Sequence, residues 1–349
     1  MTNQSRRNFL KCAALAAPTA FVGCRSANVC AERSGRPLKI CVFADFHFSH
    51  LTPTNCVESH AALKRILARA EQAKCDFVIQ LGDFAHDVND KEVKKAIELY
   101  KNFSLPTYSL FGNHDQEMNG WRDVVQAFNM PNNYYSFDRG GFRFVVTDPN
   151  YYKTASGKFV HYSDGVFGDE KGSSSPWVPS EQLEWMRSVI IDSPYPCVVF
   201  SHQSFEIPPS HGGVCNKDAV QDIFREANAR KPGTVRLVIN GHNHCDHRTI
   251  IDNILYWDVT SVKGQWFEEK HHKYPADYEK GHWLSEHTIN WKDPLSAILI
   301  LWPEGRIQIE GMKSDYLFGV SPKVAGFKEY YGERYSAVPY IQDIDITLR

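Results

Sequence analysis

Five short polar blocks contain the residues that could do chemistry in this 349-residue sequence, and each block follows an apolar run. They are Asp45-Phe46-His47, Gly82-Asp83, Gly112-Asn113-His114-Asp115, Ser201-His202 and Gly241-His242-Asn243-His244. Carboxylate, imidazole and amide ligands together favour Zn, Fe, Mn or a similar ion over Mg or Ca alone. A single Gly-Asp or Asp-x-His is weak evidence, because most such pairs are turns or surface coincidences. Five blocks in one chain indicate a shared metal site.

The seven candidate ligands divide into two sets that share one carboxylate. One ion would be bound by Asp45, His47, Asp83 and His244. A second ion would be bound by Asp83, Asn113, His202 and His242. Asp83 can belong to both sets because its two oxygens can bridge two ions. Two ions about 3.5–4 Å apart form a clamp for in-line displacement at phosphorus.

The apolar runs before the blocks are predicted strands, because each is short and ends abruptly at a polar residue. These strands cover residues 38–44, 76–81, 106–111, 197–200 and 235–239. Amphipathic periodicity predicts helices over 58–74 and 91–103, between the first three strands. Strands that alternate with helices indicate a parallel sheet, and ligands of such folds bind at the carboxyl ends of the strands.

The rest of the chain has a different pattern, which predicts pairs of strands joined by tight turns. Hairpins are predicted for 134–147, 248–259 and 297–310, and a helix with Ser180 as its N-cap for 180–191. Parallel strands combined with hairpins predict an α/β fold in which two packed sheets are flanked by helices. Residues 312–349 have no clear periodicity and are predicted to form an irregular tail packed on the domain.

The order of the five blocks resembles the calcineurin-like metallophosphoesterase superfamily, over roughly residues 38–310. The resemblance implies a phosphoesterase domain at 38–311, built as a two-sheet sandwich with a binuclear centre at the strand ends. It implies the same two ligand sets as the chemistry above. It further implies that His114 protonates the leaving oxygen and that Asp115 orients His114. The sequence departs from the family at His86, where many members have Asp, and it lacks the Tyr ligand of purple acid phosphatases.

The expected activity is hydrolysis of a small phosphate ester by a metal-bound hydroxide. An alternative is cleavage of a phosphodiester or a pyrophosphate, in cyclic nucleotides or nucleotide diphosphate compounds. A remote alternative is a metal-binding module without catalysis, but such a module should lack a ligand or the general acid. The net charge of −2 provides no basic field for nucleic acid, so a small phosphate ester is the expected partner.

Two long connections, 151–179 and 264–292, are candidates for lids over the site. The second is rich in aromatic residues, including Trp266, Tyr274 and Trp291. These rings could stack on a nucleobase or a sugar, or they could hold the loop onto the body of the protein. Both interpretations remain open at the level of sequence.

Residues 1–31 are predicted to be an export signal. Arg6-Arg7 precedes an apolar run at 12–22, and the pair resembles the twin-arginine signal that exports folded proteins. Residues 21–24 resemble a lipoprotein cleavage box in which Cys24 is acylated, and cleavage near Ala31 is the alternative. The expected location is periplasmic or otherwise outside the cytoplasm, with membrane attachment only through lipid on Cys24.

Overall fold

The computed structural model describes residues 36–49, 53–164, 173–267, 269–278, 283–327 and 337–348. The predicted export signal and Cys24 lie outside the described residues. Within the described part of the chain, no helix is both long enough and apolar enough to cross a membrane.

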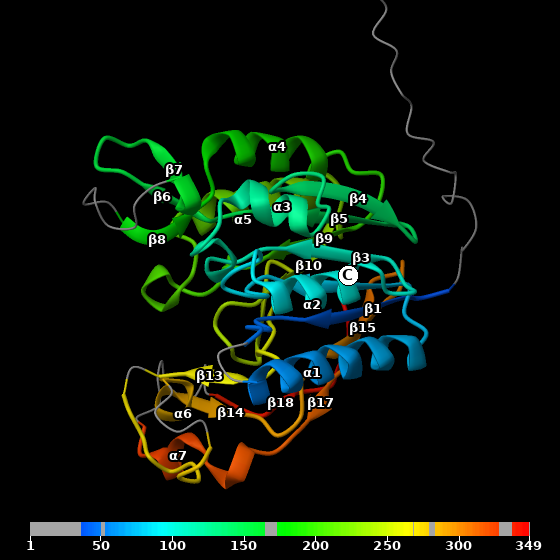
Figure 1. Cartoon of the computed structure of the whole chain (residues 1–349). Coiled ribbons are helices and arrows are strands. Elements are labelled where there is room, and N and C mark those ends of the chain that lie inside the picture. Colours follow the sequence, from blue (N-terminus) through cyan, green and yellow to red (C-terminus); the bar gives the residue numbers. More distant parts are fainter. Residues whose placement is uncertain are drawn as a thin grey trace, which may run out of the picture. The chain divides into compact units, whose positions relative to one another are not determined.

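The first large sheet has six strands in the order β19-β16-β15-β1-β2-β3. They are β1 (Leu38–Phe43), β2 (Phe77–Leu81), β3 (Thr107–Leu110), β15 (Ala297–Leu301), β16 (Arg306–Glu310) and β19 (Ile344–Thr347). The strands β1, β2 and β3 are parallel, and the other three add to them in antiparallel pairs. The parallel strands are connected by α1 (Pro53–Gln72) and α2 (Lys91–Lys101), as the sequence predicts. Figure 1 labels β1, β3 and β15 of this sheet, together with the helices α1 and α2.

Helix α2 illustrates why these segments fold as they do. Its buried side chains are Val93, Ala96, Ile97 and Tyr100, which the helical period of 3.6 places on one face. Asp90 begins the helix, because its side chain accepts hydrogen bonds from the backbone N–H groups of Glu92 and Val93.

The second large sheet has the order β11-β12-β10-β9-β5-β4. Its strands are β4 (Tyr135–Arg139), β5 (Phe142–Val146), β9 (Cys197–Ser201), β10 (Val235–Asn240), β11 (His247–Ile251) and β12 (Ile254–Asp258). The four strands from β12 to β5 are parallel, and a hairpin strand lies at each edge. Helices α4 (Ser180–Ile190) and α5 (Lys217–Arg230) contact this sheet.

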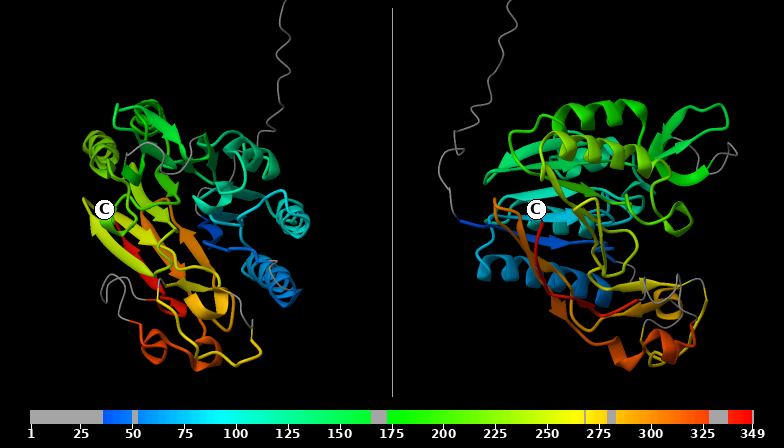
Figure 2. Two further views of the ribbon diagram at one scale, coloured as in Figure 1. Left: turned by 60° about the vertical axis from the view of Figure 1, so that its left-hand side comes forward. Right: turned by 180° about the vertical axis from the view of Figure 1, so that it is seen from behind.

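The two sheets are packed face to face with helices on both outer sides (Figure 2). Side chains of β5 show the layering, because successive residues of a strand point to opposite faces. Phe144 and Val146 belong to the large core between the sheets, whereas Val145 belongs to the smaller core beneath α4 and α5. The predicted α/β sandwich flanked by helices is therefore confirmed.

The remaining elements are short. They comprise β6 (Tyr151–Lys153), β7 (Phe159–His161), β8 (Ser173–Trp177), β13 (Gly264–Trp266), β14 (Thr288–Asn290), β17 (Met312–Lys313), β18 (Tyr340–Ile341), α3 (Trp121–Ala127), α6 (Trp283–His287) and α7 (Pro322–Ala325). Four 3₁₀ helices, η1 (His114–Gln116), η2 (Tyr162–Asp164), η3 (Pro209–His211) and η4 (Leu317–Gly319), complete the described elements.

Two local predictions are wrong. The segment 312–349 is not simply an irregular tail, because β19 pairs with β16 at the edge of the first sheet. Its alternating Ile344-Asp345-Ile346 packs the isoleucines against the core while Asp345 forms an ion pair with Arg306. The N-cap of α4 is Pro179, and Ser180 is already the first helical residue.

Candidate metal centre

The five polar blocks meet where β1, β2, β3, β9 and β10 end. Backbone hydrogen bonds tie the blocks together: Asp45 N–H donates to Gly82 O, His47 N–H to Asp83 O, and Gly241 N–H to His202 O. The chain therefore brings its predicted ligands together through the loops that follow the strands. Six of the seven fall into two groups, in each of which the ligand atoms lie within 4.8 Å of one another.

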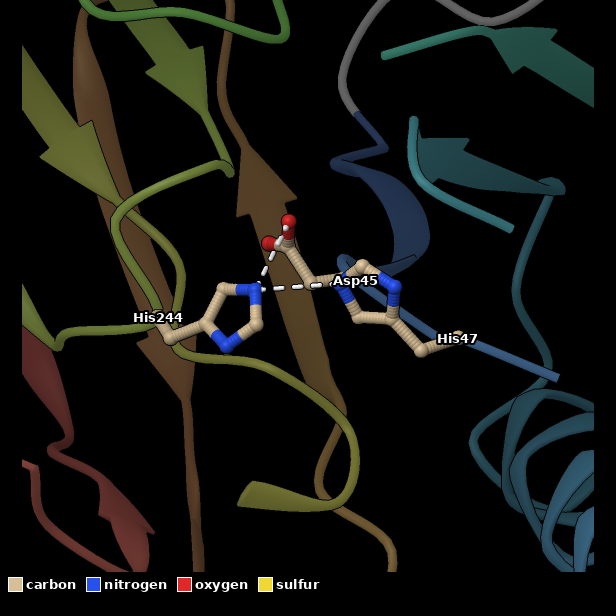
Figure 3. Close-up of side chains that lie close together, drawn as sticks. All are labelled: Asp45, His47 and His244. Atoms are coloured by element: carbon tan, nitrogen blue, oxygen red, sulfur yellow. Dashed lines mark hydrogen bonds and ion pairs between the residues drawn. The ribbon is translucent and has the colours of Figure 1, made fainter. Parts of the chain in front are cut away.

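The first group consists of Asp45, His47 and His244 (Figure 3). The Nε2 atoms of His47 and His244 are 3.2 Å apart, and His244 Nε2 is 3.3 Å from Asp45 Oδ1. His244 Nδ1 is 2.9 Å from the carbonyl oxygen of Gly264, so this nitrogen donates and Nε2 presents its lone pair to the group. A carbonyl behind the ring is the usual support of a metal-binding histidine.

The second group consists of Asp83, His202 and His242. His202 Nε2 is 3.0 Å from Asp83 Oδ2, and its Nδ1 donates to the carbonyl oxygen of Leu81 at 2.8 Å. Asp83 Oδ2 also lies 3.8 Å from His47 Nε2, so this carboxylate stands between the two groups. That position is the one a bridging ligand requires.

Asn113, the remaining predicted ligand, lies beside the second group. The backbone N–H of the next residue, His114, donates to Asp83 Oδ1 at 2.8 Å. Gln203 Nε2 lies 3.4 Å from Asn113 Oδ1 and donates to Asn150 Oδ1 at 2.7 Å. The side chain of Gln203 is buried, and together with Asn150 it restricts the orientation of the Asn113 amide.

The backbone at the predicted ligands is unusual. Asp45, His47, Asp83, His242 and His244 have φ values of 52°, 42°, 51°, 68° and 49°, in the left-handed region that residues other than Gly rarely adopt. This conformation curls the chain sharply after each strand, so that side chains from different strands converge.

Space around the ligands is also limited. A Cβ on Gly112 would lie 2.1 Å from Asp83 Oδ1 and 2.4 Å from His202 Nε2. A Cβ on Gly241 would lie 2.6 Å from Asp45 Oδ2. Only glycine leaves these carboxylates and the imidazole in place.

The charges of the groups suit a metal ion. Burial lowers the pKa of His242 to about 3 and the pKa of His47 well below its usual value, so both rings are neutral. Neutral imidazole is the form that binds metals. The Nε2 atoms of His47 and His244 are 3.2 Å apart, and two lone pairs at this distance repel each other unless a cation or a proton lies between them. The residues present therefore fit two metal ions.

His202 behaves differently in the metal-free chain. Burial opposes its protonation, but the adjacent Asp83 carboxylate outweighs burial and raises the pKa of His202 to about 9. In the metal-free chain, a proton on His202 thus neutralises part of the Asp83 charge, which a bound metal ion would neutralise in its place.

The predicted partner of His114 is wrong. Asp115 is buried and accepts the backbone N–H groups of Ala85 and Gly112, both at 2.9 Å. The Nδ1 atom of His114 instead lies 2.5 Å from Glu117 Oε1. The reason is helical geometry, because residues three apart share a face of the 3₁₀ helix η1 and adjacent residues do not. The i,i+3 spacing in the sequence could have identified Glu117.

Two further side chains border the site. His86 Nδ1 lies 2.7 Å from Glu117 Oε2, so one carboxylate contacts two imidazole rings. The ring of Trp266 lies 4.2 Å from the ring of His47 and 4.8 Å from that of His114, between centroids. Within the aromatic connection 264–292, Trp266 lies at the site, whereas Trp291 Nε1 donates to Ser261 O and anchors the loop to the body of the protein.

A sequence profile of the calcineurin-like phosphoesterase family matches residues 38–246, which is more than half of the chain. The chain belongs to the calcineurin-like phosphoesterase family. A comparison with curated proteins found no significant match. Phosphoesterases of this family use a dinuclear metal centre, and the two groups described above supply its candidate ligands. This calcineurin-like phosphoesterase is accordingly a hydrolase of phosphate esters with a dinuclear centre.

Solved structures share the fold of this phosphoesterase at low sequence identity. A dimetal phosphatase from Danio rerio is 14% identical with a TM-score of 0.57, over 90% of this chain and 100% of that chain. GAP50, described as the anchor in the inner membrane complex of Plasmodium, is 13% identical with a TM-score of 0.50, over 90% of both chains. A phosphatase and an anchor share the fold, so the side chains of the site must decide the chemistry.

Proposed function

We propose that Asp45, His47, Asp83, Asn113, His202, His242 and His244 hold two ions and that the chain hydrolyses a small phosphate ester with them. The observation that carries this proposal is the position of Asp83, 3.0 Å from His202 and 3.8 Å from His47, between two groups of ligand-type side chains. When bound, the two ions would supply an activated water and neutralise charge on the phosphoryl oxygens.

The residues of the chain would orient the substrate and supply the proton. His114 lies next to Asn113, and its Nδ1 contacts Glu117 Oε1 at 2.5 Å. Its ring lies 4.8 Å from the ring of Trp266 and 5.2 Å from the ring of His47, between centroids. Burial alone would lower the pKa of His114, but the carboxylates of Asp83 and Glu117 outweigh it and raise that pKa. A ring that retains its proton near neutral pH can donate it to the leaving oxygen, and Glu117 holds the ring in place.

The proposal is tested by counting metals and measuring turnover on the same protein. Purified chain should bind at least two ions and hydrolyse para-nitrophenyl phosphate, its bis-ester or a nucleotide diphosphate. Asp83→Asn removes the charged bridge, so it should lose at least one ion and lower turnover by orders of magnitude. Asp87→Asn, at a half-buried carboxylate four residues away, serves as the control. Normal turnover with full metal content in Asp83→Asn would contradict the proposal.

A second substrate class, nucleotide diesters or pyrophosphates, is favoured by the position of Trp266. Its ring lies 4.8 Å from the ring of His114, the proposed proton donor, so a leaving group would pass beside an aromatic surface. Aromatic rings stack on nucleobases with about 1–3 kcal/mol per base. Trp266→Leu should therefore raise KM for nucleotide substrates about 5- to 160-fold while leaving KM for an alkyl phosphate unchanged. Equal KM changes for both substrates would argue against this class.

We further propose that the chain acts outside the cytoplasm after export as a folded protein. Arg6-Arg7, followed by an apolar run, supports this route, which reads the guanidinium pair and not charge alone. Replacing both arginines by Lys should leave the protein in the cytoplasm. Mass spectrometry of the mature N-terminus would separate acylation at Cys24 from cleavage near Ala31. Export of the Lys-Lys variant at the normal level would contradict the twin-arginine route.

A further inference from the structure

Another group of ligand-type side chains lies away from the predicted centre and from the cluster of His86, His114 and Glu117. Glu206, His247 and Asp258 each place one ligand atom within 4.8 Å of the other two. Glu206 Oε2 is 3.3 Å from His247 Nε2, and these side chains are only 9% and 7% exposed. Asp258 is completely buried. None of the three belongs to the seven predicted ligands of the dinuclear centre.

Three separate segments of the chain create this group. His247 is the first residue of β11 and Asp258 the last residue of β12, and the antiparallel register pairs them directly. Residues paired in this way have Cβ atoms about 4.5–5.5 Å apart, which is close enough for their side chains to share a ligand. Glu206 comes from the loop after β9, where Ser204 Oγ accepts the backbone N–H of Glu206 and turns the chain.

The spacing within the group is that of metal ligands. Two ligand atoms that are each about 2.1 Å from a tetrahedral ion lie about 3.4 Å from each other. The 3.3 Å between Glu206 Oε2 and His247 Nε2 agrees with this value. It also equals the 3.3 Å between His244 Nε2 and Asp45 Oδ1 in the predicted dinuclear centre.

The surroundings orient Asp258 and leave a buried acceptor beside it. Asn240 Nδ2 and Asn243 Nδ2 both donate to Asp258 Oδ1, which fixes the carboxylate as outer-shell donors fix metal ligands. Asn240 is fully buried, and among the described residues its Oδ1 has no hydrogen-bond partner. A buried acceptor without a donor is destabilising, and a nearby cation or its water would offset that cost.

The local charge also favours a cation. Glu206 and Asp258 place two carboxylates in the group, and Asp258 is completely buried. Arg248 pairs with Asp246 at 2.8 Å, so that arginine offsets a carboxylate outside the group. The two carboxylates match the charge of one divalent ion, and carboxylate oxygens together with an imidazole nitrogen suit Zn or Mn.

We propose that Glu206, His247 and Asp258 bind a third divalent transition-metal ion, in a structural site separate from the dinuclear centre. The ion would join the loop after β9 to the β11–β12 hairpin. It would also stabilise the block Gly241-His242-Asn243-His244, because Asn243 donates to Asp258 at 3.2 Å.

Metal counting on the full-length chain tests the third site. Protein saturated with Zn or Mn and freed of excess metal should contain three ions per chain by mass spectrometry. Glu206→Gln and His247→Gln should each contain two. The control Asp252→Asn, in the exposed turn of the same hairpin, should retain three. Circular dichroism should show that each variant is folded, and thermal unfolding should occur at lower temperature in the two ligand variants.

Two outcomes would overturn the third site. One is a wild-type chain that binds only two ions under saturation with either metal, in which case the group is a buried ion pair of Glu206 and His247. The other is a folded Glu206→Gln chain that still binds three. Neither outcome affects the dinuclear centre, whose failure would instead appear as normal metal content and turnover in Asp83→Asn.

Discussion

Replacing His114 by Ala should separate proton donation from metal binding, although Asn113 is its immediate neighbour. His114 donates its backbone N–H to Asp83 Oδ1 at 2.8 Å, and an alanine at this position retains that N–H. The ring that is removed contacts Glu117 at 2.5 Å, and Glu117 is not a predicted ligand. Both ions should therefore stay bound in His114→Ala.

The expected loss of rate follows from the role of the ring. A positioned general acid contributes about 10²–10⁴ in rate, which corresponds to roughly 3–5 kcal/mol of barrier. The full loss should appear for an alkyl phosphate, whose alkoxide leaves poorly without a proton. A nitrophenolate has a low pKa and leaves without help, so para-nitrophenyl phosphate should lose much less.

The assay measures kcat with both substrates on protein whose metals have been counted. His86→Ala is the matched control, because His86 also contacts Glu117, at 2.7 Å, but is not assigned the proton. It should keep the wild-type ratio of the two rates. If His114→Ala loses metal, or slows both substrates equally, the general-acid role is refuted and a structural or phosphoryl-binding role replaces it.

Three other predictions concern the site and the fold. Gly112→Ala should lose metal and activity, because its Cβ would lie 2.1 Å from Asp83 Oδ1, whereas Gly120→Ala, with its nearest atom at 3.5 Å, should behave as wild type by metal content. The pKa of His202 is about 9 in the metal-free chain, so this ring carries a proton at pH 7. Metal binding at pH 7 should release that proton, and the affinity for metal should therefore rise with pH up to about 9. Calorimetry in buffers of different ionisation enthalpy measures this release, and its absence would contradict the prediction. Ile346→Ala should lower the free energy of unfolding by about 1–2 kcal/mol in chemical denaturation, because β19 is half-buried against the core; no change would mean that β19 contributes little to stability.

The main features of the fold and of the ligand groups could be predicted from the sequence, because each depends on a local signal. The strand before Asp45 is a nearly continuous apolar run, and the sequence changes from apolar to charged at Asp45 itself. Helix α2 repeats its apolar residues with the helical period, which no strand would do. The strand β19 cannot be predicted in this way, because its four residues carry too little alternation to be distinguished from a loop.

The parts of the site that depend on tertiary packing could not be predicted in the same way. Glu117 required knowledge that residues 114–116 form a 3₁₀ turn and not an extended loop. Trp266 comes from a short strand whose position beside His47 is set by pairing with β14. The pairing of His247 with Asp258 depends on the register of a hairpin, and a shift of one residue would separate them.

The left-handed backbone at the predicted ligands affects which substitutions can stabilise this chain. Each such residue other than Gly costs roughly 1–2 kcal/mol, so the five at Asp45, His47, Asp83, His242 and His244 together cost about 5–10 kcal/mol. That sum is comparable with the whole net stability of an ordinary domain. Asp45 and Asp83 offset part of this cost, because they accept the backbone N–H groups of His242 and His114. A chain that needed only the scaffold would be more stable with Gly or Asn at the histidine positions, and His47→Gly should raise the melting temperature of the metal-free protein. The strand ends are thus the place where stabilising mutations are easiest to find and where each of them removes a ligand.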